Sequence, residues 1–449
     1  MINGKQEMSR RTFLQTAGAL AGSAVALPYL VPGDVLAAQM RMGANQRLNV
    51  AIIGAGERGA SHLAFLVDRM GKGELNVAAV CDADEKRLDK ARQIAGPRAK
   101  AYRDYRYVLQ SKDVDAVIIA TPDHRHGVQF VQAAECGKHV YCESPACSTI
   151  DEGKSMIAAA RKAKIVTQIG AQGRSLPEAN LMRRYLAGGE IGDVTKVACW
   201  SSPGMVDDNP VPDEDPPSEL DWDLWLGPLR RQSYNPRFSN GVFRWMMESG
   251  GGRICHPGAH VMSCAMWWMG ADGTGPVSVE AQGTAPMQGL WDTAVEMAVT
   301  YTFKNPDWVL TWNQPGKPVE PEERAAEQSP IAQTSCGAVY QGEKGEAVAW
   351  GGDMGIWVEQ KVREWKPPTA TEAGKSPGHV EDWLNGIRTG AKTIMNVEAG
   401  VGVAHLCILG NLAFILGRKL NWDNQNLEIT GDEQARRFMA RPQRFPYYM

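Results

Sequence analysis

Three glycines with the spacing of a dinucleotide-binding loop follow a short apolar segment. Gly54, Gly56 and Gly59 form the pattern G-x-G-x-x-G directly after residues 48–53. The first glycine permits a tight strand-to-helix turn, the second lets the backbone approach a pyrophosphate, and the third lets a helix pack closely on the strand. A second apolar segment ends in Asp82, whose carboxylate could accept hydrogen bonds from ribose hydroxyls. The pattern predicts a bound dinucleotide, against the alternative of a glycine turn in an ordinary α/β core.

The charges near Asp82 bear on which dinucleotide binds. Asp82 would repel a 2′-phosphate, which favours NAD over NADP. Lys86, Arg87 and Arg58 are close in sequence and weaken that preference. We therefore predict NAD, with NADP as the alternative.

Two further strand ends carry polar side chains. Thr121 and Pro122 end one apolar segment, with His126 shortly after them, and Glu143 and Ser144 end the next. Because the carboxyl ends of parallel strands meet at one edge of a sheet, these residues should gather beside the nicotinamide. The alternative for the histidines of this segment is a helix-capping turn at the surface. The predicted cofactor-binding residues are Gly54, Gly56, Glu57, Arg58, Gly59, Asp82, Arg87, Thr121, Pro122, His126 and Glu143.

A pair of histidines follows a second glycine-rich segment. His256 and His260 would share one helix face if the helix began before them, but Pro257 and Gly258 predict that it begins at that point. Histidine suits the removal of a hydroxyl proton near neutral pH, so we predict His260 as the general base, with His256 orienting it or sharing the proton. The alternatives are two structural histidines at a helix start, or a metal site. No acidic third ligand lies nearby in sequence, and no metal is predicted.

Four more residues complete the predicted site. Ser144 would hydrogen-bond the substrate, and Gln172 and Arg174, at a third strand end, would orient it. Trp245 is one of 14 tryptophans, and such rings suit sugars, although they suit cores and interfaces as well.

The elements that position these residues alternate between strand and helix over residues 48–170. This alternation predicts an N-terminal Rossmann domain with a doubly wound parallel sheet. The expected strands are 48–54, 76–81, 116–120, 139–142 and 165–169, and the expected helices are 59–69, 84–95, 126–136 and 150–163. Residues 171–430 read as a second α/β domain for substrate binding and oligomerisation, with residues 431–449 as a tail. Its expected strands are 195–201, 277–283, 293–303 and 308–312, its helices 258–269, 381–387 and 398–416, and its loops 203–218 and 315–330.

Composition limits the possible partners. The chain has 449 residues and a formal net charge of −3, without a basic block of five or more, so nucleic acid is not expected to bind. Its nine cysteines are scattered and odd in number, which predicts buried thiols and not a disulfide framework.

The first 38 residues have the pattern of a twin-arginine export signal. Ser9-Arg10-Arg11-Thr12-Phe13-Leu14 is the motif, a weakly apolar run follows, and Leu36-Ala37-Ala38 offers small residues for cleavage. The run is short for a membrane span, so we expect none after processing. The pattern predicts the translocation machinery as a partner and a periplasmic or otherwise exported protein, with residues 39–47 as an N-terminal arm. An ordinary amphipathic start is the alternative.

Taken together, these motifs resemble the glucose–fructose oxidoreductase and inositol dehydrogenase family (Gfo/Idh/MocA). The glycine loop, Thr121-Pro122, the strand end at Glu143, Gln172 with Arg174, and the segments 221–228 and 417–423 carry the resemblance. It implies a Rossmann domain followed by an α/β domain with a large open, mainly antiparallel sheet. It also implies bound NAD(P), polyhydroxylated substrates that are mostly sugars, and a homo-oligomer, either dimer or tetramer.

The chain departs from the family at two catalytic positions. Ser144 stands where the family has a lysine that helps the proton leave the substrate, and a neutral hydroxyl cannot replace an ammonium. His256 stands where the family usually has an aspartate, while His260 matches the retained histidine. The main prediction is an exported NAD(P)-dependent oxidoreductase acting on a sugar or a sugar derivative. The alternatives are an NAD-dependent glycosidase, which oxidises the sugar transiently before elimination and hydration, and a non-catalytic dinucleotide-binding scaffold.

Overall fold

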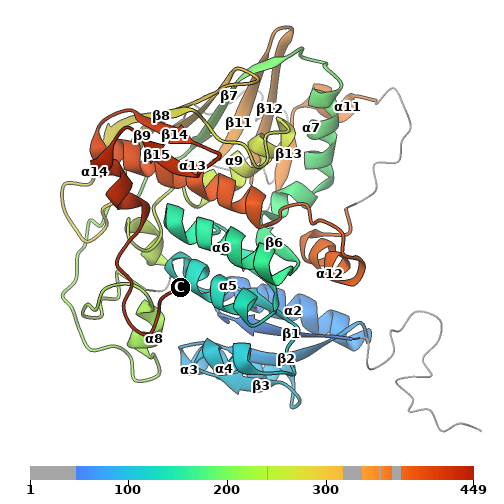
Figure 1. Ribbon diagram of the computed structural model, residues 1–449, viewed down its shortest axis with the longest axis vertical. Coiled ribbons are helices and arrows are strands. Elements are labelled where there is room, and N and C mark those ends of the chain that lie inside the picture. Colours follow the sequence, from blue (N-terminus) through green and yellow to red (C-terminus); the bar gives the residue numbers. More distant parts are fainter. Residues whose placement is uncertain (1–46, 240, 317–335, 353–354, 367–375) are drawn as a thin grey trace, which may run out of the picture.

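The computed structural model describes residues 47–239, 241–316, 336–352, 355–366 and 376–449 (Figure 1). The predicted export signal, residues 39–46 of the arm and most of the predicted loop 315–330 lie outside the described residues.

The N-terminal half forms a parallel sheet of six strands in the order β3-β2-β1-β4-β5-β6. Its apolar strands are buried on both faces, as sequences without polar alternation require. Helices α2, α3 and α12 pack on one face, and α4, α5 and α6 on the other. The strands are β1 (Leu48–Ile53), β2 (Leu75–Cys81), β3 (Lys100–Tyr102), β4 (Ala116–Ile119), β5 (His139–Glu143) and β6 (Thr167–Gly170). The helices are α2 (Glu57–Gly71), α3 (Glu85–Ala95), α4 (Tyr105–Gln110), α5 (His126–Glu135), α6 (Ile150–Ala163) and α12 (His379–Thr389).

This strand order reverses direction between β1 and β4. In open α/β sheets, ligands bind outside the carboxyl ends of the strands at such a point. The glycine loop follows β1 and Thr121 follows β4, so the predicted cofactor residues lie on both sides of the reversal.

The second half forms a sheet of nine strands in the order β13-β12-β11-β7-β10-β9-β8-β14-β15. All of its neighbouring strands are antiparallel except β7 and β10, so the mainly antiparallel sheet is confirmed. The strands are β7 (Val194–Ser201), β8 (Ser278–Thr284), β9 (Glu296–Phe303), β10 (Trp308–Gln314), β11 (Cys336–Gly342), β12 (Gly345–Gly351), β13 (Ile356–Val358), β14 (Leu420–Asp423) and β15 (Glu428–Thr430). The remaining helices are α7 (Pro177–Ala187), α8 (Trp222–Leu226), α9 (Pro257–Trp268), α11 (Gln360–Glu364), α13 (Val397–Leu416) and α14 (Glu433–Arg436).

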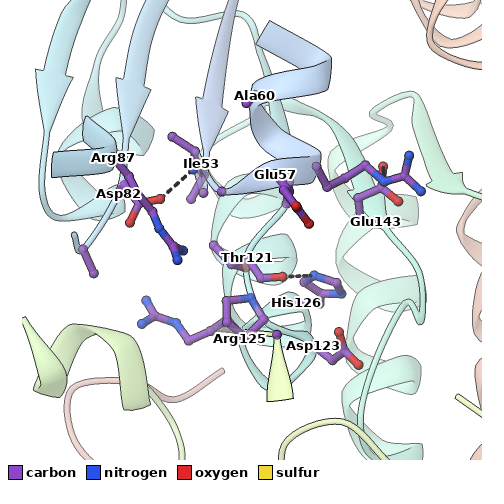
Figure 2. A pocket seen from close by; sticks show the side chains of 18 of the residues that line it. Ile53, Glu57, Ala60, Asp82, Arg87, Thr121, Asp123, Arg125, His126 and Glu143 are labelled. Carbon is purple, nitrogen blue, oxygen red and sulfur yellow. Dashed lines mark hydrogen bonds and ion pairs between the residues drawn. The ribbon is translucent and has the colours of Figure 1, made fainter. Parts of the chain in front are cut away.

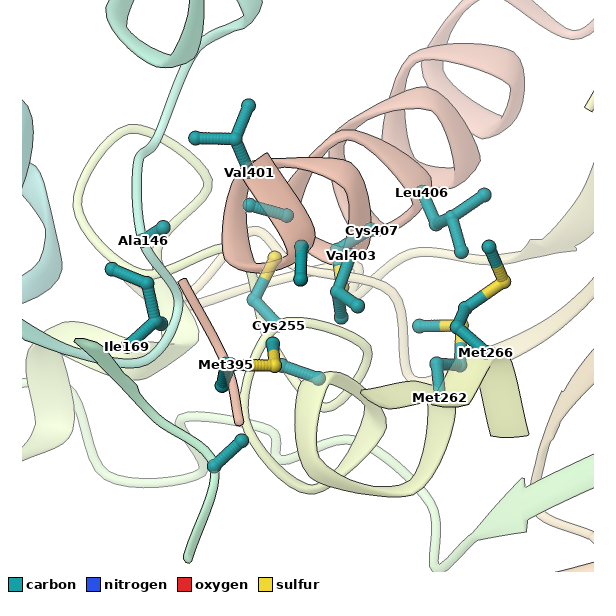
Figure 3. Packing of buried hydrophobic residues seen from close by; sticks show 14 of the residues in the cluster. Ala146, Ile169, Cys255, Met262, Met266, Met395, Val401, Val403, Leu406 and Cys407 are labelled. Atoms are coloured by element: carbon teal, nitrogen blue, oxygen red, sulfur yellow. The ribbon is translucent and has the colours of Figure 1, made fainter. Parts of the chain in front are cut away.

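Helices α9 and α13 join the two sheets into one core. Helix α13 packs against β8, α9 and α6, so it contacts both halves of the molecule (Figure 1). Figure 3 shows Leu406 of α13 beside Met266 of α9, with Met262 next to it. Helix α13 is the one helix among the described residues that is long and apolar enough to cross a membrane, yet most of it is buried in the protein. Its apolar composition is therefore explained by its place in the core.

The structure adds short elements that the sequence did not predict. Strand β3 has three residues and α4 has six, and their patterns are too short to stand out from loop sequence. Strands β11 to β15 were also missed, although β11 and β12 form a regular antiparallel pair. Helix α9 begins at Pro257, as its sequence predicted. All nine cysteines are free thiols, and seven of them are buried, in agreement with the prediction.

Candidate active site

A cavity of about 890 Å³ lies at the carboxyl edge of the parallel sheet and extends to the start of α9. The glycine loop and Asp82 line this cavity together with Ser144, His256 and His260. Figure 2 shows Asp82 and Arg87 on one side of this cavity and Glu143 on the other. Residues predicted from five separate segments of the chain therefore meet around one space.

The glycine loop has the geometry that a pyrophosphate needs. Gly54 has φ +91°, and a Cβ there would lie 2.6 Å from the Ala120 carbonyl oxygen. A Cβ on Gly59 would lie 1.8 Å from the Gly54 oxygen, so α2 can approach the loop after β1 this closely only because residue 59 has no side chain. Helix α2 begins at Glu57, directly after Gly56, and directs its free N–H groups at the cavity. These residues fit a dinucleotide.

Asp82 is held at the predicted place by the backbone. Its carboxylate accepts hydrogen bonds from the N–H of Ala55 at 2.7 Å and of Asp84 at 2.9 Å. Burial raises its pKa, and these bonds partly offset that effect. Arg87 lines the cavity next to it, whereas Lys86 pairs with Glu219. One of the two cations that follow Asp82 in sequence therefore lines the cavity beside it.

Glu143 is a buried carboxylate surrounded by donors. Its Oε1 lies 2.5 Å from His62 Nε2, 2.9 Å from Gln172 Nε2 and 3.6 Å from Arg58 Nε. Burial alone would raise the pKa of Glu143, but the hydrogen bond and charge of His62, with help from Arg58 and Gln172, lower it to about 2. Glu143 is therefore ionised and fixed in place. His62 was not predicted, because a lone histidine within a helix carries no signal of its partner.

His126 links two strand ends. Its Nδ1 lies 2.8 Å from the Pro145 oxygen and its Nε2 lies 2.9 Å from the Thr121 oxygen (Figure 2). The ring is buried and lines the cavity, and burial lowers its pKa. Its neighbour His124 is also buried, with Nε2 3.0 Å from the Trp225 oxygen. The alternative of surface histidines in this turn is therefore wrong.

The predicted catalytic residues meet at the start of α9. The hydroxyl of Ser144 lies 3.1 Å from His260 Nε2. His256 precedes the first residue of α9, and its Nε2 lies 3.2 Å from a carboxylate oxygen of Asp123. Burial raises the pKa of Asp123 and lowers that of His256, so both effects favour an uncharged pair. An acidic partner for His256 thus exists, but it is 133 positions away in sequence.

Comparison with known proteins places the chain in a family. The description "oxidoreductase family, NAD-binding Rossmann fold" matches residues 48–171, and "oxidoreductase family, C-terminal alpha/beta domain" matches residues 195–347 and 356–449. The chain belongs to the Gfo/Idh/MocA family. The resemblance stated from its motifs is confirmed.

Named relatives of this Gfo/Idh/MocA protein match about a third of the chain. Levoglucosan dehydrogenase of Pseudarthrobacter phenanthrenivorans is 31% identical over 188 residues, which cover 39% of this chain and 45% of the relative. Inositol 2-dehydrogenase 1 of Saccharopolyspora erythraea is 33% identical over 162 residues, or 34% of this chain and 45% of the relative. The matched segments thus span less than half of these relatives.

Solved structures share the fold over most of the chain. The WlbA dehydrogenase of Bordetella pertussis, in complex with NADH and UDP-GlcNAcA, has a TM-score of 0.61 at 17% identity and covers 84% of this chain and 99% of its own. Levoglucosan dehydrogenase in complex with NADH has a TM-score of 0.58 at 20% identity, with the same coverage. At these identities the likeness shows the α/β fold alone.

Three residues predicted to bind substrate lie outside the cavity lining of this Gfo/Idh/MocA protein. Arg174 is fully buried and donates to both oxygens of Asp272, because the turn after β6 directs it into the second domain. Gln172 donates to Glu143 and to the Tyr141 hydroxyl. Trp245 packs under the guanidinium of Arg253, which does line the cavity. In this structure Arg174 is structural, and the other two support residues that face the cavity.

The described residues contain no group of three His, Cys, Asp or Glu side chains able to hold a metal ion. Asp123, Arg125, Arg244 and Arg253 line the cavity but were not predicted. Asp123 and Arg125 are close in sequence to His126, and this proximity to a predicted site residue could have indicated them. Arg244 and Arg253 flank the second glycine-rich segment, and their sequence alone gives no reason to place them at the site.

Proposed function

We propose that this protein is an NAD-dependent oxidoreductase that transfers a hydride between a sugar hydroxyl and a bound nicotinamide cofactor. The observation that carries the proposal is the contact of 3.1 Å between Ser144 Oγ and His260 Nε2, in the same cavity as the glycine loop. The relatives named above are dehydrogenases of levoglucosan and inositol, which supports a polyhydroxylated substrate and favours an oxidoreductase over a glycosidase.

The side chains at the start of α9 would manage the substrate proton. His260 Nε2 faces Ser144 and would accept the proton of the carbinol hydroxyl as the hydride leaves its carbon. The nicotinamide, when bound, supplies the hydride acceptor. Ser144 would hydrogen-bond the substrate oxygen and keep the ring of His260 in place. The uncharged Asp123–His256 pair is one helical turn away and would orient this end of the helix.

The proposal is tested by following NADH absorbance with a panel of sugars and polyols. The His260→Ala variant should lose about 10²–10⁴-fold in kcat, because it lacks the base, while NAD affinity stays unchanged. His139→Ala is the matched control, because His139 begins β5 at the opposite end of the strand and contacts the Val166 N–H. Undiminished turnover in His260→Ala would reject the assignment. Release of an aglycone without lasting NADH would replace the oxidoreductase with a glycosidase.

The cofactor preference is proposed on the same basis. Asp82 would favour NAD, while Arg87, which also lines the cavity, leaves room for NADP. Titrating NAD and NADP against the wild type and against Asp82→Asn separates the effect of Asp82 from that of Arg87. Wild type should bind NAD more tightly, and the variant should lose that preference.

Export is a further part of the proposal. The residues that support it are the motif Ser9 to Leu14 and the small residues at 36–38. Folded export would let the protein carry its cofactor out of the cytoplasm. Replacing both Arg10 and Arg11 with Lys should leave the full-length chain in the cytoplasmic fraction. Equal export of wild type and variant would contradict this prediction.

Oligomerisation is proposed from the outer face of the nine-stranded sheet. Trp200, Val348 and Trp350 form an apolar cluster separate from the core under α9 and α13, with Val339 and Trp357 packed against it. The first three are buried in the single chain, whereas Val339 and Trp357 are half-buried, and a dimer or tetramer would cover what remains exposed of this face. Sedimentation velocity on the purified protein decides the matter, since a monomer at micromolar concentration would contradict it.

A further inference from the structure

Two arginines line the cavity at the same end as His256 and His260. Arg244 lies in the short helix Val242–Trp245, and Arg253 lies just before α9. The N–H of Gly252 donates to the Arg244 oxygen at 2.8 Å, so the backbones that carry the two side chains are in contact. Glycine is needed in this loop, because a Cβ on Gly250 would lie 2.4 Å from the Arg244 Cα.

Neither guanidinium has a carboxylate partner among the described residues. Arg244 donates to the Gly241 oxygen at 2.9 Å and lies over the Phe243 ring. Arg253 donates from Nε to the Pro203 oxygen at 2.9 Å and lies over the Trp245 ring. Each guanidinium has five N–H donors in a planar fork, so most of its donors remain available to a ligand.

Three other buried or half-buried arginines of this region do have carboxylate partners, whereas Arg125, which is also buried and lines the cavity, lies over the rings of Tyr105 and Tyr447. Arg174 pairs with Asp272, Arg441 with Glu152, and Arg444 with Asp223. These three arginines stabilise the fold through ion pairs. Arg244 and Arg253 contact only backbone oxygens and aromatic rings among the described residues. A cation that is half buried without an anionic partner is costly, and an anionic ligand would offset that cost.

The charge of Arg244 is also felt by the catalytic residues. Burial is the largest influence on the pKa of Asp123 and of His256, and the charge of Arg244 is the next for both. A ligand held by Arg244 would therefore lie beside the residues proposed to manage the substrate proton. This cationic pair belongs to a different segment of the cavity lining from the glycine loop, where the cofactor phosphates are expected.

We infer that the substrate is a sugar acid, a uronate or an aldonate, whose carboxylate binds Arg244 and Arg253 while a hydroxyl faces His260. This inference rests on the proposed function and names its substrate class. Planar guanidinium groups match the two oxygens of a carboxylate. A singly charged carboxylate fits this end better than a doubly charged phosphate, because the ionised Glu143 lines the same cavity.

The test measures binding, so it does not depend on turnover. Calorimetric titration of the NADH-loaded protein would compare D-glucuronate, D-galacturonate and D-gluconate with the methyl ester of each acid. The ester keeps the skeleton and removes the charge. At least one acid should bind about 10-fold or more tightly than its ester, since hydrogen bonds between charged partners are roughly twice as strong as neutral ones.

Three variants assign the preference to residues. Arg244→Gln and Arg253→Gln should each reduce the difference between acid and ester to less than about 3-fold. Arg161→Gln is the matched control, because it removes one positive charge from a side chain on α6 that is 68% exposed, and it should keep the full difference. Circular dichroism and NADH binding verify that each variant is folded.

Each outcome decides one of the two proposals. Equal binding of every acid and its ester, or a preference that survives both cavity variants, overturns the inference. Tighter binding of glucose 6-phosphate than of any acid also overturns it. Reduction of NAD by neutral sugars without any preference for acids would keep the oxidoreductase and reject the sugar acid. Arginine-dependent binding of an acid that is never oxidised would keep the anion site and reject the oxidoreductase.

Discussion

Removal of His62 should make the protein less stable at neutral pH, because His62 makes the shortest of the contacts that hold the buried carboxylate of Glu143. His62 Nε2 lies 2.5 Å from Glu143 Oε1, and both side chains are buried. The pKa of Glu143 falls from 4.5 to about 2, a difference of about 2.5 units. At about 1.36 kcal/mol per unit, ionised Glu143 contributes roughly 3 kcal/mol to the free energy of unfolding at pH 7.

The sign of the pH dependence follows from the direction of this shift. A carboxyl group with a lowered pKa in the folded state stabilises the protein above pH 4.5 and loses that contribution as the pH falls towards 2. Without His62, only Arg58 and Gln172 oppose the effect of burial, and the pKa of Glu143 rises. The ionised carboxylate then destabilises the fold at pH 7, while protonation relieves the penalty at lower pH.

Urea unfolding followed by tryptophan fluorescence measures this effect. His62→Ala should lower the free energy of unfolding by about 3 kcal/mol at pH 7 and by clearly less at pH 4. His62→Gln can still donate a hydrogen bond and should recover part of the loss. His139→Ala serves as the control for loss of an imidazole from the same domain. If His62→Ala loses the same stability at both pH values, the coupling between His62 and Glu143 is not the cause and the reasoning fails.

Three other changes test the glycine loop and two buried side chains of the core. Gly59→Ala should weaken NAD binding about 10-fold or more in a fluorescence titration, because its Cβ would lie 1.8 Å from a loop carbonyl oxygen, whereas Gly71→Ala, with no atom within 4 Å, should bind normally. Arg441→Ala should lower the free energy of unfolding by about 3–5 kcal/mol in urea, since it removes the cation that pairs with the buried carboxylate of Glu152. Adding Glu152→Gln should restore part of this loss, and a loss that the second change leaves intact would contradict the pairing. Burial lowers the pKa of His405 from 6.5 to about 4, so the stability it supports is present above pH 6.5 and lost as the pH falls towards 4. The melting temperature of His405→Leu should therefore change less between pH 7 and pH 5 than that of the wild type. An equal change in the two proteins would refute this prediction.

Local sequence determined the parts of the site that depend on backbone geometry. The spacing of Gly54, Gly56 and Gly59 predicted the turn and the start of α2, and the segment after β2 predicted where Asp82 lies. These features depend on residues within one strand, one turn and one helix. Short-range sterics and hydrophobic periodicity therefore encode them, and both can be read along the chain.

Contacts between distant segments could not be predicted in the same way. His62 and Glu143 are 81 positions apart, and His256 reaches Asp123 across 133 positions. Arg174 follows a strand end, as a ligand-binding residue should, but its side chain turns to Asp272 and is fully buried. The sequence predicted where the backbone of these residues lies. It did not predict the direction in which their side chains point.

The sequence by itself thus determined the family, the parallel sheet and the edge of that sheet where a dinucleotide would bind. The tertiary structure alone decided which charges meet there. Arg244 and Arg253 enter the cavity without a carboxylate among the described residues, whereas Arg174 finds one in the core. The physical reason is that backbone preferences act over a few residues, while the partner of a charged side chain is set by the packing of whole elements against one another.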